Sequence, residues 1–588
     1  MQNAKVVSER LLAHGFEYVV VDYLWYRRKV AGAYTNSLGF DAIDKWGRVI
    51  PDPERWPSSK GGKGFSEVAN KVHAMGLKFG IHVMRGISTQ AVNANTLILD
   101  TVKGTAYEDS SRQWRAKDIG LKNRTCAWMS QGFMSVDTKS GAGRAFLRSL
   151  YQQYAEWGVD FVKNDCVFGD DLDVNEINIV SEVLKDLSRP ILYSLSPGTS
   201  VTSSMAEKVS NLVNIYRITG DDWDTWRDVE AHFNVSRDFA AANMIGANGL
   251  KGKSWPDLDM LPLGWLTDPG SNEGPHRKCN LTLNEQRTQM TLWSIAKSPL
   301  IYGGDLRQLD QSTYNLITHP ILLEINSFST HNMEFPYITG EKDNRSGNRA
   351  LSVPSRNSDK LRKSNAYVGL SSCKDHGSTR WVIEALDQEH ERICWKDNLG
   401  SKYEPLFCLH RRKSLLISDE ETIHKQQYDG KLHLLSTDDK ELCLDASPRK
   451  KLTSGEMKIN SFFPCRLKAN QMWKFNLNGT LTSSYSGQCA VLKVKKAKAK
   501  VESGGIRCWI ATGRRGEIYV SFFNLSAEKT VISAKISDLT KAFPSRNLRR
   551  ASCKYREVWS AKYYGAGNQT ISIPVEMHSS ALFVLNCI

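Results

Sequence analysis

Short runs of β-branched and aromatic residues alternate with amphipathic segments along the first half of the chain. The runs have the length and composition of buried strands. The segments between them, such as "FSEVANKVHAMG" and "AFLRSLYQQYAEWG", are amphipathic and close on a glycine, as helices often do. This alternation predicts βαβ units and a parallel sheet. The expected strands are residues 16–22, 78–84, 160–165, 190–195, 213–219, 254–261 and 298–305.

Four of these seven expected strands finish in a polar or charged residue, at Asp22, Asp165, Thr219 and Asp305. The carboxyl ends of parallel strands are where a (β/α)8 barrel carries its active site, so the pattern predicts that α/β fold. Seven strands leave the barrel one short. Because the chain opens with a helical pattern that would follow a first strand, we expect that strand to lie upstream of Met1.

Beyond about residue 330 the helical pattern stops and the chain becomes rich in β-like runs. Gln471-Met472-Trp473, followed by "NGTLTSSYSGQCA", resembles the Q-x-W repeat of ricin-type β-trefoil lectins, although an ordinary hairpin with a buried Trp has the same pattern. From about residue 513, alternation at period two predicts a small antiparallel sandwich. We expect three domains: an N-terminally incomplete barrel at 1–328, a trefoil-like β-rich insert at 329–510 and a C-terminal β-sandwich at 511–588.

The composition fits a globular protein, since 41% of the 588 residues are hydrophobic and can fill the cores of two or three domains. No run of about 18 apolar residues occurs, so we expect no membrane span. The net charge of +15 is partly concentrated at 410–413 and 493–500. These runs fit solvated basic faces, and weak attraction to an acidic polysaccharide is compatible with them. No aromatic residues are interleaved with the lysines, so we expect no nucleic acid partner.

Two features indicate secretion, although the opening "MQNAKVVSERLLAHG" lacks the apolar core of a signal peptide. Ten of the twelve cysteines lie beyond residue 270, spread singly through β-like sequence, which suits disulfides better than metal ligands. Seven N-x-S/T sequons also occur. We therefore expect a secreted glycoprotein with a longer natural precursor or an alternative start. The sequons begin at Asn123, Asn234, Asn280, Asn344, Asn478, Asn524 and Asn568.

Two strand ends carry candidate catalytic carboxylates. In "WGVDFVKNDC", Lys163 lies two residues before Asp165 on the same side of the strand and would hold it ionised, as a carboxylate nucleophile requires; a plain salt bridge is the alternative. In "YRITGDDWDTW", Arg217 ends a strand and Asp221 follows Gly220, although an Asp at a helix N-terminus needs no catalytic role. Two carboxylates at the mouths of neighbouring strands suit glycoside cleavage.

Eight segments form a recognisable series: "GFEYVVVDYLW", "KFGIHVM", "RTCAW", "WGVDFVKNDC", "YRITGDDWDTW", "WPDLDML", "RTQMTLWSIAKSPLIYGGDL" and "HPILLEIN". In order and rough spacing the series resembles the melibiase clan, glycoside hydrolase family twenty-seven, over residues 1–328, as does the closing sandwich. The resemblance implies a retaining α-galactosidase-like exo-glycosidase that needs no metal or cofactor.

The resemblance also implies roles for individual residues. Asp165 matches the nucleophile and Asp221 the general acid/base, with the acid protonated at rest and the two carboxyl groups about 5 to 5.5 Å apart. Cys126 matches a cysteine bonded to the one after the nucleophile; Cys166 is one residue closer to Asp165 than the family pattern, so we expect a shifted bridge. Asp22 and Lys163 match residues that bind sugar hydroxyls, and Arg217 matches the arginine four residues before the acid/base. Trp25 and Asp259 match residues of the sugar pocket.

Three departures bear on the sugar that is accepted. Tyr23 stands where α-galactosidases have an aspartate near the 6-hydroxyl, and its ring should crowd the hydroxymethyl group; β-L-arabinopyranose lacks that group. Ser196 stands where galactose enzymes often have Glu, and a serine there resembles α-N-acetylgalactosaminidases. His82 stands where tyrosine is common, either as a sugar contact or as a packed histidine.

The β-rich insert resembles that of plant members that act on both α-galactosides and β-L-arabinopyranosides. The implied partners are galactoside or arabinopyranoside saccharides, such as arabinogalactan side chains in the cell wall or apoplast. The missing first strand would leave the barrel open and the chain as written unstable or inactive. The alternative from another class is a non-catalytic, lectin-like carbohydrate-binding protein.

Overall fold

The computed structural model divides the chain into two compact units, residues 1–348 with 501–588, and residues 349–500. It describes residues 1–342 apart from 32, 34–35, 103–111, 170–171, 197–200, 246–253 and 267–276. In the second unit it describes 366–374, 378–385, 390–395, 407–412, 431–432, 442–446, 457–459, 462–464, 471, 473–483 and 487–494. It also describes 505–587 apart from 547, 549–550 and 566–568.

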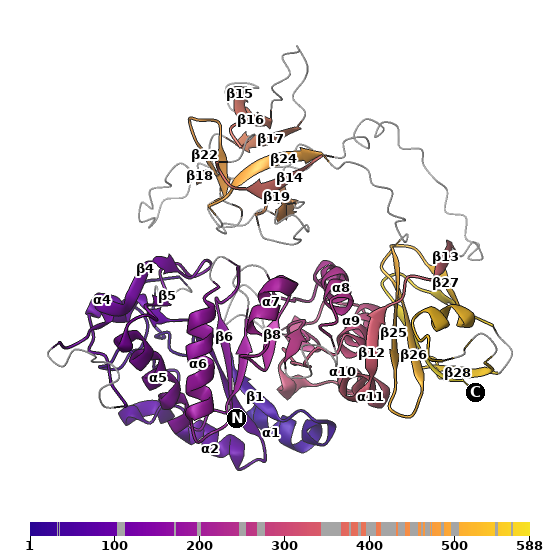
Figure 1. The fold of residues 1–588 in the computed structure, drawn as a ribbon, viewed down its shortest axis with the longest axis horizontal. Helices are drawn as coiled ribbons and strands as arrows, with labels where there is room; N and C mark the ends of the chain where they lie inside the picture. Colours follow the sequence, from indigo (N-terminus) through magenta and orange to yellow (C-terminus); the bar gives the residue numbers. More distant parts are fainter. Residues whose placement is uncertain are drawn as a thin grey trace. The chain divides into compact units, whose positions relative to one another are not determined.

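Six strands of the first unit form one parallel sheet in the order β1-β2-β6-β7-β8-β9 (Figure 1). Each strand matches one of the expected runs, and the result is a TIM-barrel-like α/β fold. Within the described residues no ladder joins β9 to β1. The strands are β1 (Tyr18–Val21), β2 (Lys78–Met84), β6 (Phe161–Asp165), β7 (Leu192–Leu195), β8 (Ile215–Arg217) and β9 (Trp255–Asp257).

The run at 298–305 is not a strand in the structure, contrary to expectation. It forms one isolated parallel bridge, between Leu261 and Tyr302. Pro299 has no N–H to donate to a ladder, and two glycines follow Tyr302, which weakens a strand further. The Tyr302 hydroxyl instead donates to the Leu263 carbonyl at 2.8 Å.

The helices begin and end where the sequence carries caps. Ser140 accepts from the Gly143 N–H at the start of α5, and Thr282 and Glu285 form a capping box on α9. Gly158 follows α5 with φ 83°, a conformation that glycine adopts without strain. The main helices of this unit are α2 (Ser66–His73), α5 (Gly141–Glu156), α6 (Val174–Asp186), α7 (Ser203–Val209), α8 (Trp226–Ala241), α9 (Leu283–Ile295), α10 (Gln311–Ile317) and α11 (Pro320–Phe328).

Smaller elements complete the first unit. Residues 2–11 are helical, as the opening pattern predicted, with α1 at Gln2–Val6. Two short helices, α3 (Thr89–Ala94) and α4 (Ala116–Ile119), accompany a three-stranded sheet in the order β3-β5-β4. The short strands are β3 (Ile87–Ser88), β4 (Gly120–Thr125), β5 (Phe133–Val136), β10 (Trp265–Leu266) and β11 (Arg277–Lys278).

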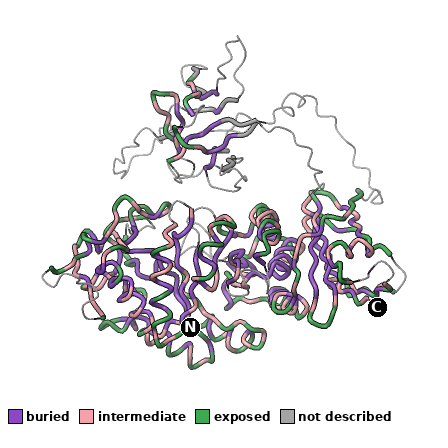
Figure 2. Tube along the Cα trace, viewed as in Figure 1, coloured by how far each residue is buried: buried purple, intermediate pink, exposed green. Residues whose placement is uncertain are grey.

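An antiparallel β-sandwich follows the barrel in the same unit. One sheet has the order β12-β25-β26-β31-β28-β29 and the other β13-β27-β30. Buried residues run along its strands as they do along the parallel sheet, so each has an apolar core (Figure 2). The strands are β12 (Thr330–Glu334), β13 (Thr339–Lys342), β25 (Ile506–Thr512), β26 (Ile518–Asn524), β27 (Thr530–Lys535), β28 (Cys553–Glu557), β29 (Tyr563–Tyr564), β30 (Thr570–Val575) and β31 (Ser580–Cys587).

The strands of the sandwich come from two segments of the chain, one before and one after the second unit in the sequence. The insert expected at 329–510 would contain β12, β13 and the start of β25, but β12 pairs antiparallel with β25, and β13 with β27. The reason is local: Phe335, just after β12, is buried in the sandwich core with Ile506 and Ile532. The barrel and sandwich meet where the His578 ring stacks on Trp226 with centroids 4.0 Å apart.

The second unit is composed of short antiparallel strands. Its sheets have the orders β18-β22-β23-β24-β14-β20, β15-β16-β17 and β19-β21. Trp473 of the Q-x-W motif is buried, and its ring nitrogen donates to the Leu444 carbonyl at 2.9 Å. The strands are β14 (Ala366–Ser371), β15 (Trp381–Ala385), β16 (His390–Trp395), β17 (Phe407–Arg412), β18 (Lys431–Leu432), β19 (Leu442–Leu444), β20 (Met457–Ile459), β21 (Phe462–Pro464), β22 (Trp473–Phe475), β23 (Leu481–Ser483) and β24 (Cys489–Val494).

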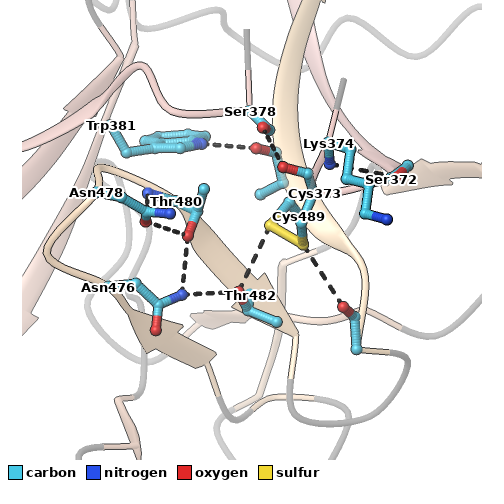
Figure 3. Close-up of a disulfide and its surroundings, with 12 residues drawn as sticks. Ser372, Cys373, Lys374, Ser378, Trp381, Asn476, Asn478, Thr480, Thr482 and Cys489 are labelled. Atoms are coloured by element: carbon cyan, nitrogen blue, oxygen red, sulfur yellow. Dashed lines mark hydrogen bonds between the residues drawn. A yellow bond between two sulfur atoms is a disulfide. The ribbon is translucent and has the colours of Figure 1, made fainter. Parts of the chain in front are cut away.

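A disulfide between Cys373 and Cys489 joins the segment after β14 to the start of β24 (Figure 3). Beside it, the Trp381 ring nitrogen donates to the Ala490 carbonyl at 2.7 Å. The core described for this unit contains three buried tryptophans, Trp381, Trp395 and Trp473, packed with aliphatic side chains such as Leu370 and Ile393. The trefoil assignment of the insert stays a prediction.

Candidate active site

The predicted catalytic residues lie at or just beyond the carboxyl ends of β6 and β8, which are separated in the sheet by β7. Asp165 is the last residue of β6 and stands opposite Met84 of β2. Arg217 is the last residue of β8 and stands opposite Asp257 of β9. Because all six strands are parallel, these ends share one edge of the sheet, where a TIM-barrel-like fold places its site.

Asp165 is buried and held at both oxygens. His82 Nε2 lies 3.1 Å from Asp165 Oδ2, and the Cys166 N–H donates to Oδ1 at 2.5 Å. Burial acts to raise the pKa of Asp165, but the hydrogen bond from His82 and the charges of Arg217 and Lys163 outweigh it and hold the pKa below its ordinary value. The residue is therefore an ionised, fixed carboxylate.

A disulfide fixes the turn behind Asp165. Cys126 and Cys166 are bonded, with Cα atoms 5.7 Å apart, so the bridge expected from the family resemblance is present. Cys166 has φ 65°, and two other residues just beyond strands, Leu24 and Asp259, have φ 63° and 77°. Non-glycine residues rarely adopt this conformation, because it costs roughly 1 to 3 kcal/mol for each residue. Residues strained in this way are found most often at functional sites.

Arg217 connects the two halves of the site. Its Nη1 donates to Asp259 Oδ1 at 2.7 Å and its Nη2 to Asp221 Oδ1 at 2.8 Å. Lys163 Nζ lies 3.9 Å from Asp259 Oδ1. Burial acts to raise the pKa of Asp259, but the Arg217 and Lys163 charges outweigh it and lower that pKa. Two cations therefore share the edge of the sheet with carboxylates Asp165, Asp221 and Asp259.

Asp221 differs from Asp165 in exposure. Its side chain is 68% exposed, against 13% for Asp165. Among the described residues it pairs with Arg217, and most of its side chain is open to solvent. The next residue, Asp222, is fully buried, and burial followed by the charges of Asp259 and Asp228 raises its pKa well above the ordinary value.

The other predicted residues divide into three groups. Asp22 is exposed and Tyr23 half-buried at the end of β1, with the Tyr23 ring centroid 6.1 Å from that of His82. Ser196, after β7, is buried, and its hydroxyl has no hydrogen-bond partner in the described part of the chain. Trp25 is only 1% exposed and lies in the core, where its ring nitrogen donates to the His82 carbonyl at 2.6 Å. Trp25 therefore contacts the backbone of His82, whose side chain is part of the site.

Three residues of the site were not singled out from the sequence. The Trp128 ring lies 6.3 Å from Tyr23, and its only signal was its place in the "RTCAW" segment. Burial, followed by the charge of Asp259, raises the pKa of Asp257 to about 6. The Gln289 amide donates to Asp222. Buried carboxyls and their amide partner depend on tertiary packing, which the sequence pattern does not show.

Two further features of the described residues concern other kinds of site. They contain no group of three or more His, Cys, Asp or Glu side chains arranged to hold a metal ion. None of the helices described is long and apolar enough to cross a membrane. The side chains that the structure describes at this edge of the sheet are carboxylates, two cations, an imidazole and hydroxyls.

Known proteins resemble the chain in both parts of the first unit. Residues 117–327 match the family Melibiase_2, "Alpha galactosidase A", and residues 503–585 match Melibiase_C, "Alpha galactosidase C-terminal beta sandwich domain". An α-galactosidase, mel1, of Schizosaccharomyces pombe is 24% identical over 349 residues, covering 55% of this chain and 62% of that protein. The human α-galactosidase A is 25% identical over 328 residues, covering 55% of this chain and 57% of that protein.

Solved structures show the same fold. A β-L-arabinopyranosidase of Geobacillus stearothermophilus, assigned to glycoside hydrolase family 27, superposes with a TM-score of 0.61 and 24% identity, covering 100% of this chain and 91% of that one. The chain spans less than two thirds of the length of the curated relatives named above, 62% and 57%.

Proposed function

Because the chain belongs to the melibiase family, glycoside hydrolase family twenty-seven, we propose that it is a retaining exo-glycosidase. The substrates would be terminal α-D-galactosyl or β-L-arabinopyranosyl residues of saccharides, including arabinogalactan side chains. The observation that carries the proposal is the pair of unlike carboxylates at one edge of the sheet. Asp165 is buried and ionised, whereas Asp221 is exposed, and Arg217 donates to Asp221 at 2.8 Å.

The proposed reaction is a double displacement. Asp165 attacks the anomeric carbon while Asp221 gives its proton to the leaving oxygen, so that one carbon–oxygen bond forms as the other breaks. Asp221 then takes a proton from water, and that water releases the sugar from Asp165 with retained configuration. The exposure of Asp221 supports its role, since the acid must meet both a leaving group and water.

The sugar hydroxyls would be held by the charged groups around this pair. Asp259 and Lys163 lie beside Arg217, and Asp22 is exposed at the end of β1. Carboxylates and ammonium groups form strong, directional hydrogen bonds with hydroxyls. The unpartnered, buried Ser196 hydroxyl is suited to a group at C2, which also keeps an α-N-acetylgalactosaminidase-like specificity open.

Tyr23 supports a preference for the pentose. Its ring is half-buried against His82 and Trp128, so it cannot be displaced without losing both ring contacts. A phenol held there would crowd the hydroxymethyl group of galactose, whereas β-L-arabinopyranose has the same ring hydroxyls without that group.

The test compares paired nitrophenyl α-D-galactopyranoside and β-L-arabinopyranoside, with Asp165→Asn as the blank. We expect turnover that is absent from the blank and a higher kcat/KM for the arabinopyranoside. Tyr23→Ala should raise the galactoside to arabinopyranoside ratio about 10-fold, and Tyr23→Phe, which keeps the ring, should leave it unchanged. A folded protein without turnover on either sugar would overturn the proposal.

We also propose that the protein is secreted and glycosylated. The disulfides Cys126–Cys166, Cys373–Cys489 and Cys553–Cys587, and exposed sequon asparagines such as Asn123 and Asn280, support this. Asn524 is excluded, because its buried amide donates to three backbone carbonyls. Peptide mapping after enzymatic deglycosylation should therefore show modified Asn123 or Asn280 and unmodified Asn524.

A lectin-like role of the second unit is the second candidate. Gln471 of the Q-x-W motif donates to Asp445 Oδ2 at 3.1 Å, and both side chains are buried. A carboxylate fixed by an amide is a typical element of a sugar site. Galactose binding that survives Asp165→Asn and is lost in Asp445→Ala would support this candidate over catalysis alone.

A further inference from the structure

The His82 side chain is placed for a single polar contact. It lies on β2 opposite Lys163 of β6 and is 2% exposed. Nε2 is 3.1 Å from Asp165 Oδ2, whereas Nδ1 is buried and has no hydrogen-bond partner in the described part of the chain. A neutral imidazole carries one proton, and only Nε2 has an acceptor for it. The ring therefore donates from Nε2 to the carboxylate.

The carboxylate of Asp165 thus has one donor on each oxygen. The Cys166 N–H reaches Oδ1 from the turn after β6, and His82 reaches Oδ2 from the neighbouring strand. Donors from two different elements fix both the rotation and the tilt of the carboxylate plane. A sugar hydroxyl is not needed to complete this arrangement.

The His82 ring is itself held in place by aromatic residues. The backbone carbonyl of His82 accepts a hydrogen bond from the Trp25 ring N–H at 2.6 Å. The Tyr23 ring packs edge to face against the imidazole at an interplanar angle of 67°. Trp25 is 1% exposed and packs against Phe65 and Trp157. The core of the barrel therefore fixes the backbone of His82, while the Tyr23 ring packs against the imidazole that contacts the carboxylate.

We infer that His82 is a positioning residue for Asp165, which orients the nucleophile and stabilises its ionised form, and is not a ligand of the sugar. The inference rests on the proposed glycosidase function. It assigns the buried imidazole a task in the first displacement, when Asp165 must be anionic and aligned with the anomeric carbon.

The charged groups near this contact give the expected direction with pH. Lys163 faces His82 from β6, and Arg217 acts on Asp165 from β8. Burial alone raises the pKa of Asp165, so removing the His82 donor leaves only the two cations to oppose burial. The acid limb of kcat/KM, which reports ionisation of the nucleophile, then moves to higher pH.

The test compares two substitutions. His82→Gln keeps an N–H donor near the Nε2 position and cannot titrate in the working range, whereas His82→Phe keeps a ring and removes the donor. We expect His82→Gln to stay within about 5-fold of the wild-type kcat, and His82→Phe to lose about 10- to 100-fold in kcat with KM changed less than about 3-fold. The acid limb of His82→Phe should rise by about one pH unit.

Other outcomes distinguish failure of the inference about His82 from failure of the proposed glycosidase function. A loss confined to KM, or a His82→Phe enzyme with the wild-type kcat and acid limb, would overturn the inference while the glycosidase stands. Absence of wild-type turnover on both sugars would overturn the proposed function. In that case the ¹⁵N signals of the His82 ring still decide the geometry. An Nε2–H tautomer that shifts in Asp165→Asn supports the contact, and an Nδ1–H tautomer rejects it.

Discussion

The two ends of the proposed site treat the same kind of side chain in opposite ways. At the end of β6, Asp165 is 13% exposed, has a donor on each oxygen and is followed by a disulfide-bonded residue. Beyond β8, Asp221 is 68% exposed and is held by Arg217 alone among the described contacts. A nucleophile benefits from rigidity and constant charge, whereas an acid/base must change its charge and meet water. The contrast teaches that surroundings, not residue type, separate the two roles.

The largest effect is expected when each carboxylate is removed. Asp165→Ala should lower kcat by roughly 10⁴-fold or more, because no other group can form the covalent bond. Added azide should then fill the vacated space and give a glycosyl azide of inverted configuration. NMR of the product measures this, and Asp238→Ala, an exposed aspartate of α8, is the matched control. A retained azide product from this variant would contradict the assignment.

Asp221→Ala should show a loss that depends on the leaving group. Alkyl or sugar leaving groups need the proton, so their rate should fall by about 10²- to 10⁴-fold, whereas a dinitrophenolate leaves without help and should be nearly unaffected in its first step. Azide should now give the product of retained configuration, since it attacks the sugar already bound to Asp165. Equal losses of rate for all leaving groups would contradict the role of Asp221 as the acid that protonates the leaving group.

The covalent tie on the Asp165 side should matter for stability. Cys126 and Cys166 enclose a separation of 40 residues, for which chain-entropy arguments give about 4 kcal/mol. We expect the Cys126→Ser, Cys166→Ser double variant to unfold at lower denaturant, with kcat reduced and the leaving-group dependence unchanged. The Cys553→Ser, Cys587→Ser pair, in the sandwich, is the control: it should lower stability and leave kcat of the folded protein intact.

The smallest effect is expected at Asp222, on the other side of the comparison. Burial raises its pKa well above the unfolded value, so folding is weakened as the pH rises from the unfolded pKa towards the folded one. Asp222→Asn stays neutral and should lose less stability than the wild type across that range, with a difference of about 1.5 kcal/mol at pH 5. Denaturant unfolding at pH 4 to 8 measures it; parallel curves would show that Asp222 does not titrate.

The sequence was informative where one element determines the outcome. The run ending in Asp165 is a strand, Gly158 stops the helix before it, and the family resemblance paired Cys126 with Cys166. The sequence did not predict the side-chain contacts between elements that are far apart in the chain. The contact of His82 with Asp165 joins residues 83 apart, and the burial of Trp25 comes from aromatic rings on several elements. Their side-chain directions follow from packing, which period and composition do not contain.

The interrupted sandwich has a consequence for the order in which the protein is made. β12 precedes the 349–500 unit, and its partner β25 follows it. A ribosome that has finished β12 must therefore synthesise the whole intervening unit before that strand can pair. The barrel also has a contact with the segment made after that unit, because the Thr288 hydroxyl of α9 donates to the carbonyl of His578. The first unit therefore lacks part of its sandwich until the segment beyond residue 500 has been translated, although most of its residues were made before the second unit began.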